Sequence, residues 1–366
     1  MSFVLHGLGT ALPPAVVTQE EAAACARVLS GPGVRDASWL PAVYAHSGIR
    51  TRRTVMGRGW VEDLIGGTRV SGSPFLPRGD DSAGPTTGER MQIYAREATP
   101  LAVRAAAAAV AEAGFAADSF THLVTVSCTG FASPGVDFAL IRDLGLRPTV
   151  ERVNVGFMGC HGALNGLRVA NAFTTADPAA RVLMCAVELC SLHYHCGNDA
   201  EKAVANAIFA DGAAAVVGTG GARAAHPWRL TATGSCLIPD TEAAMSWTVG
   251  DAGFEMTLSR RIPGLIAKHV RPWMGAWLRD KGLSLEEIGS WAVHPGGPKI
   301  LAAAEEGLRL PPDALAASRA VYAEYGNMSS PTVLFVVDRL RRAGAPGPCV
   351  ALGFGPGLVA EAALFR

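Results

Sequence analysis

The chain has 366 residues, which is enough for two domains of ordinary size. Its 49% hydrophobic and 17% charged residues are typical of a globular protein with a large core, which excludes a disordered or low-complexity chain. The formal net charge is zero, so the sequence predicts no binding to nucleic acid or to an anionic membrane surface.

The sequence also carries no sign of export or of disulfide bonding. No segment has the length and apolarity of a spanning helix, and the N-terminal residues lack the basic and apolar regions of a signal peptide. The eight cysteines are scattered over a large chain, which argues against a disulfide framework and leaves one or two for chemistry. We therefore expect a cytoplasmic protein without a membrane span.

The first half alternates predicted strands and helices. We expect strands over 3–13, 121–128, 151–157 and 181–190, and helices over 20–29, 86–114, 135–144 and 161–173. The segment 181–190 is fully apolar, as in a buried central strand. Thr86 and Glu89 have the spacing of a capping box. Residues 57–88 show no period and predict a long exposed loop, a candidate lid.

The second half repeats this alternation more loosely. Strands are expected over 229–238 and 289–295, helices near 260–280, 297–307 and 331–343, and an apolar segment over 350–365 closes the chain. Alternating strands and helices predict an α/β protein with largely parallel sheets. We expect two similar halves, with a change-over near 220–228 that divides the chain into 1–222 and 223–366.

Cys160 is a candidate nucleophile. It lies in MGCHGALNGLR, between a predicted strand and a predicted helix, so its sulfur is placed at a helix N-terminus. There the helix dipole and unpaired amides favour the thiolate, and the small residue before it permits a sharp turn. The alternative is a buried cysteine on a packed turn.

His294 and Asn327 are candidate partners of the nucleophile. His294 ends an apolar strand in WAVHPGGPKIL, where Pro295 and two glycines stop the strand and leave the imidazole beyond it. Asn327 precedes an apolar helix in EYGNMSSPTVLFVVDRLR, where an asparagine is usually a helix cap. Together, a thiol, an imidazole and a carboxamide supply a nucleophile, a proton partner and two donors for a thioester oxyanion.

Five segments carry a family resemblance. GFMGCHGALNGLR, IFADGAAAVVG, AVHPGGPKIL, EYGNMSSPTVLFVVDRLR and the C-terminal GFGPGL resemble the chalcone-synthase-like type III polyketide synthases of the thiolase superfamily. The matches run from about residue 120 to the C-terminus and extend more weakly over the first hundred residues. The resemblance implies a thiolase-like fold with five αβαβα layers, built from two related halves in a homodimer. The first half would carry the cysteine, and the second the histidine and asparagine.

The resemblance also implies residue roles. Cys160 would accept the starter acyl group from coenzyme A, and His294 would form an ion pair with its thiolate. His294 and Asn327 would hold the enolate formed when malonyl-CoA loses carbon dioxide, and the enolate would then extend the acyl chain by two carbons. Phe209, in IFADG, matches the aromatic gatekeeper between the coenzyme A tunnel and the cavity, although core packing would also explain it.

The substrate pocket departs from the plant pattern. His193 and Trp247 stand where plant chalcone synthases carry smaller residues, and Met256 stands where they carry a phenylalanine. A reduced cavity favours a bacterial-type product, a pyrone, a resorcinol or a related aromatic, over a flavonoid. The other expected pocket residues include a second, non-nucleophilic cysteine and a polar network that biases cyclisation; they are Cys128, Thr129, Glu188, Ser329, Gly355, Pro356 and Gly357.

The expected substrates are acyl-CoA and malonyl-CoA, with no acyl carrier protein, metal or other cofactor. The candidates for the coenzyme A site are His46, Arg50, Arg52, Arg53, Gly296, Gly297 and Lys299.

Two alternative functions and one alternative fold were weighed. An initiating ketoacyl synthase of fatty-acid synthesis also uses Cys, His and Asn, but it extends on a carrier protein and carries a different sequence after its histidine. A zinc module is suggested by CAVELCSLHYHC at 185–196, but the ligand spacing is unusual, and an odd separation puts Cys185 and Cys190 on opposite faces of a strand. A Rossmann reading of GLGTALP fails on its glycine spacing.

Overall fold

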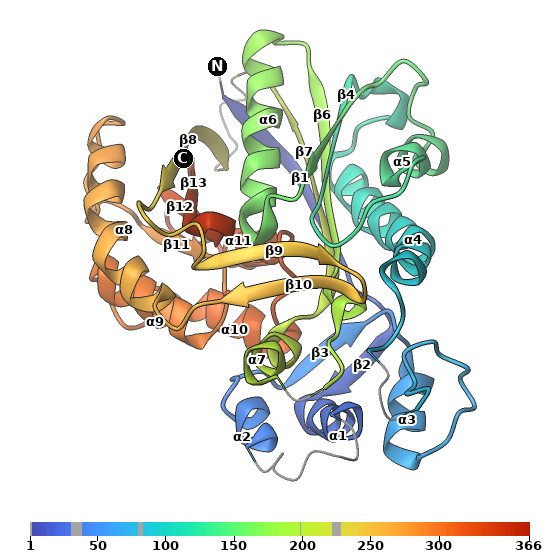
Figure 1. Ribbon diagram of the computed structural model, residues 1–366. Helices are drawn as coiled ribbons and strands as arrows, with labels where there is room; N and C mark the ends of the chain where they lie inside the picture. Colours follow the sequence, from blue (N-terminus) through green and yellow to red (C-terminus); the bar gives the residue numbers. More distant parts are fainter. Residues whose placement is uncertain (1, 31–38, 80–82, 198, 222–227) are drawn as a thin grey trace.

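The structure is a computed structural model that describes residues 2–30, 39–79, 83–197, 199–221 and 228–366. One mixed sheet organises these residues (Figure 1). Its nine strands are β1 (Phe3–Ala11), β4 (His122–Ser127), β5 (Glu151–Gly156), β6 (Arg181–Leu189), β7 (Asp211–Thr219), β8 (Arg229–Leu237), β11 (Ser290–Val293), β12 (Cys349–Gly355) and β13 (Val359–Phe365). They lie in the order β11–β12–β13–β8–β1–β7–β6–β4–β5.

Helices form three layers around the two halves of this sheet (Figure 1). They are α4 (Thr87–Ala113), α5 (Val136–Leu144), α6 (Gly162–Ala176), α8 (Ile262–Arg279), α9 (Pro298–Leu308) and α11 (Thr332–Arg342). α6 and α11 lie in the middle, α4 and α5 cover one outer side, and α8 and α9 cover the other. The five-layer arrangement expected from the sequence is therefore confirmed.

The expectation of largely parallel sheets is wrong. Within the nine-stranded sheet only the pairs β4–β5, β4–β6 and β11–β12 are parallel, and the other five pairs are antiparallel. The reason lies in the connections. Helices α5 and α6 carry the chain back across the sheet between β4, β5 and β6, whereas β12 and β13 are joined by the short turn Pro356–Leu358, which allows only a hairpin.

The long, strongly patterned elements lie where the sequence predicts them. β6 is buried over all but its first residue, as a central strand should be. Thr86 caps α4, and the reciprocal bonds with Glu89 make the predicted capping box. A second capping box, which the sequence analysis did not single out, joins Thr18 and Glu21 at the start of α1 (Gln19–Leu29).

The shorter elements were not predicted. They are β2 (Ala15–Thr18), α2 (Leu40–Ala45), β3 (Thr51–Thr54), α3 (Arg58–Gly66), α7 (Ala200–Ile208), β9 (Met245–Gly250), β10 (Gly253–Leu258), α10 (Ala316–Tyr325) and the 3-10 turns η1 (Ala117–Ser119), η2 (Gly159–His161), η3 (Cys190–His193) and η4 (Pro356–Leu358). α3 corrects the expectation of a continuous loop over 57–88, since its Trp60, Val61 and Leu64 are buried in the core.

The expected boundary between the halves, 222/223, lies outside the described residues. Across the described part of the chain, none of the helices is both long enough and apolar enough to cross a bilayer.

Candidate active site

Cys160 lies in η2, between the end of β5 and the start of α6. Gly159 makes this position possible. It has φ +71°, and a Cβ added there would lie 2.3 Å from the Pro356 ring, so only glycine allows the turn to pack against η4. The Cys160 residue is 8% exposed. The predicted placement of the cysteine directly before the helix is confirmed.

Backbone hydrogen bonds hold Asn327 in place, and a hydrogen bond from Ser329 orients its side chain. Its N–H donates to Ile208 O at 2.9 Å, and its carbonyl accepts from Ala210 N at 2.8 Å, which locks it beside Phe209. Its side-chain oxygen accepts from Ser329 N at 2.8 Å. With that oxygen occupied, the amide nitrogen is left to donate. The side chains of Asn327 and Ser329 lie close enough to the Cys160 thiol to lower its pKa.

His294 follows β11 directly, and its backbone N–H donates to Leu352 O at 2.7 Å, continuing the pairing of β11 with β12. The residue is 1% exposed, and neither ring nitrogen has a hydrogen-bond partner among the described residues. Burial, with a smaller contribution from His161, lowers the pKa of His294 to about 3. The imidazole is therefore neutral, with one donor and one acceptor free for a ligand.

His161 was overlooked although it adjoins Cys160 in the sequence. Its Nδ1 lies 2.8 Å from Asn165 Oδ1, and its buried Nε2 has no partner in the described part of the chain. The ring packs against Gly355, where a Cβ would lie 2.4 Å from its Cδ2. Burial lowers the pKa of His161. A polar residue directly after a candidate nucleophile was the available signal.

The resting Cys160 is a thiol. Burial raises the pKa of this thiol to about 11, although the hydrogen bonds from Ser329 and Asn327 act in the opposite direction. This corrects the expectation that the helix N-terminus makes Cys160 a thiolate, because loss of solvation outweighs the dipole here.

Cys160 opens onto a small cavity, called here the Cys160 cavity, with an empty volume of about 320 Å³. Seven predicted residues line it: Cys128, Thr129, Phe209, Trp247, Met256, Ser329 and Pro356. Cys190 and Met245 were not predicted to line it. Each stands two residues from a predicted pocket residue, and a period of two would have identified both. Trp247 is fixed across this space by its Nε1, which donates to Cys128 O at 2.7 Å.

Glu188 lies behind this cavity and does not line it. The carboxylate is fully buried, and it accepts from Cys128 N, Thr129 N, Thr129 Oγ1 and Ser330 Oγ at 2.6 to 3.1 Å. Burial raises the pKa of Glu188 against these bonds. Its network fixes the loop that carries Cys128, so its contact with the cavity is indirect.

Three other pocket predictions need correction. His193 is not in the Cys160 cavity: its Nε2 donates to Thr129 O at 2.6 Å, and its Nδ1 accepts from Phe254 N at 2.9 Å. Gly355 packs against His161, and Gly357 supplies the positive φ of η4, so neither lines the cavity. At both positions the backbone geometry explains why the residue is a glycine.

The basic candidates for coenzyme A separate into two groups. Arg52 is not available for a phosphate, because its guanidinium is buried and donates to the carbonyls of Asn206 and Phe209. The other two arginines lie elsewhere: the half-buried Arg53 donates to Pro14 O at 3.1 Å, and the exposed Arg50 is 3.8 Å from Glu324. Among the remaining candidates, His46 directly follows α2. Gly296 and Gly297 directly precede α9, and Lys299 lies in its first turn.

The residues of the zinc alternative do not assemble. No group of three or more metal-ligating side chains occurs over the ranges that the structure describes. Cys185 lies 3.7 Å from Ala102 O on the α4 side, and both His193 ring nitrogens are engaged.

Comparison with known proteins identifies the family. The chain matches the profiles of the chalcone and stilbene synthases, the N-terminal domain over residues 2–221 and the C-terminal domain over residues 229–366. It is 35% identical to "Alpha-pyrone synthesis polyketide synthase-like Pks18" of Mycobacterium tuberculosis, over 99% of this chain and 90% of that protein. It is 38% identical to 1,3,6,8-tetrahydroxynaphthalene synthase of Streptomyces peucetius, over 73% of this chain and 72% of that enzyme.

A solved structure supports the same family. The crystal structure of PKS-I from the brown alga Ectocarpus siliculosus superposes with a TM-score of 0.92 at 34% identity, over 100% of this chain and 98% of that one. These relatives favour the polyketide reading over a carrier-dependent ketoacyl synthase or a zinc module. The chain belongs to the chalcone and stilbene synthase family, and it is an acyl-transferring type III polyketide synthase.

Proposed function

We propose that Cys160 carries the growing acyl chain and that His294 and Asn327 act on the carbonyl oxygens. The observation that carries this proposal is the contact of Asn327 with the Cys160 sulfur, with the amide oxygen of Asn327 already occupied by Ser329. During loading, Cys160 passes its proton to His294, and its sulfur displaces coenzyme A from the starter thioester. The departing coenzyme A thiolate then takes the proton.

The same two donors serve extension. Malonyl-CoA loses its carboxylate as carbon dioxide, and the electron pair of the broken bond moves into an enolate whose oxygen accepts hydrogen bonds from Asn327 and His294. The enolate carbon attacks the acyl-Cys160 thioester, the carbon–sulfur bond breaks, and Cys160 leaves as a thiolate. The chain is then two carbons longer and attached to coenzyme A. Phe209, locked beside Asn327, would exclude water from this step.

The coenzyme A arm would enter where α9 begins. His46, Arg50 and Lys299 are exposed, and Gly48, between the first two, faces the Pro298 ring at the start of α9. Arg50, Lys299 and the helix N-terminus suit phosphate groups. Since the acyl group comes on coenzyme A, no carrier protein is needed. For the product we propose a pyrone, a resorcinol or a related small aromatic, because Trp247 restricts the Cys160 cavity.

We also propose that two copies pair as a homodimer through the face around β5. β5 is an edge strand of the sheet, and the apolar side chains of Phe131, Phe138 and Phe157 near it are 54%, 53% and 46% exposed. These three residues line one groove. An exposed apolar groove beside the open edge of a sheet is typical of an interface. The cytoplasm remains our proposed location, because all eight cysteines are free.

The test uses purified protein, an acyl-CoA starter and malonyl-CoA, without carrier protein. We expect a polyketide product by mass spectrometry from the native chain and none from Cys160→Ala. Cys236→Ala is the matched control, because Cys236 lies in β8 outside both the Cys160 cavity and its wall. Product from Cys160→Ala refutes the nucleophile, and a strict requirement for carrier protein refutes the choice of substrate.

A further inference from the structure

One row of residues crosses the neighbouring strands β11, β12, β13 and β8 (Figure 1). Gly353 of β12 pairs with Glu361 of β13, and Glu361 pairs with Ser235 of β8, whose hydroxyl donates to its carboxylate at 2.8 Å. His294 donates its backbone N–H to Leu352 O and so continues the register of β11 beside Gly353. Residues in register point to the same face of a sheet, on strands about 5 Å apart. These four residues are called here the His294 row.

The His294 row faces α6. The residues two positions from its members, Ala292, Ala351 and Ala363, share its face of the sheet. They pack in the same core cluster as Leu167 of α6. The row therefore points toward the helix that begins directly after His161.

His161 fills the space above the glycine of the row. A Cβ at Gly353 would lie 3.2 Å from the His161 Cβ, and a Cβ at Gly355 would lie 2.6 Å from its Nε2. The missing side chains of the two glycines thus make room for the imidazole. Because His294 and Glu361 flank Gly353 in the row, His161 lies over β12 with His294 on one side and Glu361 on the other.

One ring nitrogen of His161 is engaged and the other is free. Nδ1 lies 2.8 Å from Asn165 Oδ1, an oxygen that only accepts, so Nδ1 carries the hydrogen of the neutral ring. Nε2 is then the acceptor, and it is buried without a partner among the described residues. Burial lowers the pKa of His161, which keeps the ring neutral. A neutral ring with an unpaired lone pair can stabilise a positive charge beside it.

The charged side chains that face His161 in the described structure are Glu361 from β13 and Arg168 from α6, which form an ion pair. Besides burial, Glu361 raises the pKa of His161 and Arg168 lowers it. On the other side lie His294 and the neighbouring thiol of Cys160. The pKa of His294 is lowered by burial and, to a smaller extent, by His161. The two imidazoles therefore compete for a single proton.

The reaction places one proton on this pair. During loading, the S–H bond of Cys160 breaks, its electron pair stays on sulfur, and the proton forms an N–H bond on His294. His294 is then a buried cation, which is costly unless a neighbouring group offsets its charge. The departing coenzyme A thiolate later removes the proton.

We propose that His161 is a positioning residue that acts through His294: its neutral imidazole stabilises the proton that His294 takes from Cys160, with the carboxylate of Glu361 behind it. The inference rests on the proposed function, because it requires that proton transfer. It adds a third group to the thiol and its proton acceptor, one that supports the acceptor.

The test measures alkylation of Cys160 by iodoacetamide as a function of pH, with peptide mass spectrometry to separate the thiols. For His161→Gln we expect a rate about tenfold lower at neutral pH, a small part of what a proton acceptor contributes. The loss should disappear as the pH rises, because hydroxide then removes the proton. His161→Phe keeps a ring over the glycines without a lone pair and should show the same loss. His122→Gln, which changes a buried histidine on β4, is the matched control and should keep the native profile.

A double variant shows whether His161 acts through His294. In a His294→Gln background, His161→Gln should cause no further loss. Additive losses overturn the inference, and so does an equal loss at every pH or a loss in only one of the two His161 variants, since either would indicate a packing defect. If His294→Gln changes the profile and His161→Gln does not, the inference fails and the proposed function stands. If His294→Gln leaves the profile unchanged, the proposed proton acceptor is wrong and the inference fails with it.

Discussion

The proposed reaction centre (Cys160, His294 and Asn327) and a second cavity, called the Trp60 cavity after one residue of its lining, are built differently. The second cavity is separated from the Cys160 cavity by a shared wall of four side chains, Cys190, Phe209, Trp247 and Met256. The reaction centre stands on the central layers, at the ends of β5 and β11 and before α11. Backbone hydrogen bonds fix His294 and Asn327. The Trp60 cavity is enclosed by short elements and by the side chains that they carry.

This difference separates chemistry from substrate choice. A group held by backbone bonds of the sheet cannot shift without disturbing the core, so every starter meets the same donors. A wall of side chains on α1 and α3 can change without affecting the sheet. Substitutions at the centre should therefore affect all starters equally, and those at the outer wall should affect them according to chain length.

Asn327→Ala should have the largest effect. Loss of one of the two enolate donors should slow decarboxylation of malonyl-CoA by about 10²- to 10³-fold, and equally with short and long starters. The measurements are carbon dioxide release and, as an internal control, the rate of Cys160 acylation, which should fall much less. Equal loss of both rates would contradict the enolate role of Asn327.

His294→Gln should change how Cys160 reacts with pH. Burial raises the pKa of the Cys160 thiol to about 11, and His294 is the proposed acceptor of its proton. Without that acceptor the proton must leave to solvent, so alkylation of Cys160 by iodoacetamide should slow at neutral pH. The rate should then rise more steeply with pH, because only hydroxide from solvent can remove the proton. Peptide mass spectrometry separates Cys160 from the other thiols. An unchanged profile would exclude His294 as the proton partner.

The sequence was informative about the reaction centre because its residues lie in compact motifs at the ends of long elements. Gly159, Cys160 and the helix after them are contiguous, so their geometry is local. The charge of Cys160 was predicted wrongly because its thiol becomes buried only in the assembled fold, and burial raises its pKa. The fold also brings the negative charge of Glu188 near it, which raises the pKa further.

The outer wall was predicted poorly because its elements are short and their faces depend on partners. Arg52 and Arg53 are adjacent in β3, and alternation sends one inward and the other outward. Only the pairing of β3 with β2 decides which of the two arginines points inward. α3 has nine residues between segments rich in Gly and Ser, too few for a clear helical period.

Trp247→Ala tests the shared wall. The change enlarges the Cys160 cavity and frees Cys128 O from its bond, so we expect a larger share of products with additional extensions. The cost in unfolding free energy should be roughly 2–3 kcal/mol for a half-buried tryptophan. Trp273→Ala is the control, since it should destabilise without changing the products. An unchanged product distribution in Trp247→Ala would mean that Trp247 does not limit the space.

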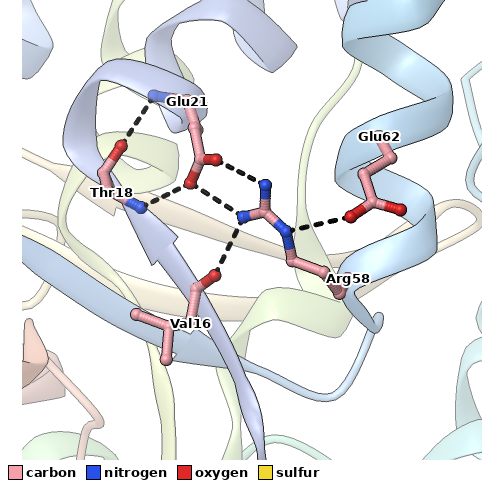
Figure 2. Close-up of polar contacts among 5 residues, drawn as sticks. All are labelled: Val16, Thr18, Glu21, Arg58 and Glu62. Atoms are coloured by element: carbon pink, nitrogen blue, oxygen red, sulfur yellow. Dashed lines mark hydrogen bonds and ion pairs between the residues drawn. The ribbon is translucent and has the colours of Figure 1, made fainter.

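Arg58→Met should have the smallest effect, and only at the outer wall. The Arg58–Glu21 pair (Figure 2) is partly exposed, so its loss should cost well under 1 kcal/mol of unfolding free energy. Arg58 lowers the pKa of Glu21 from 4.5 to about 2. A depressed carboxyl pKa stabilises the fold above the unfolded value, and this contribution disappears as the pH falls from 4.5 toward 2. The stability difference between Arg58→Met and the native chain, measured by urea unfolding, should therefore shrink over that window. At neutral pH the KM should rise for decanoyl-CoA and stay constant for acetyl-CoA, because only the longer chain reaches α3. An equal rise in KM for both starters would mean that the Arg58–Glu21 ion pair supports the whole site. The two regions would then not be independent.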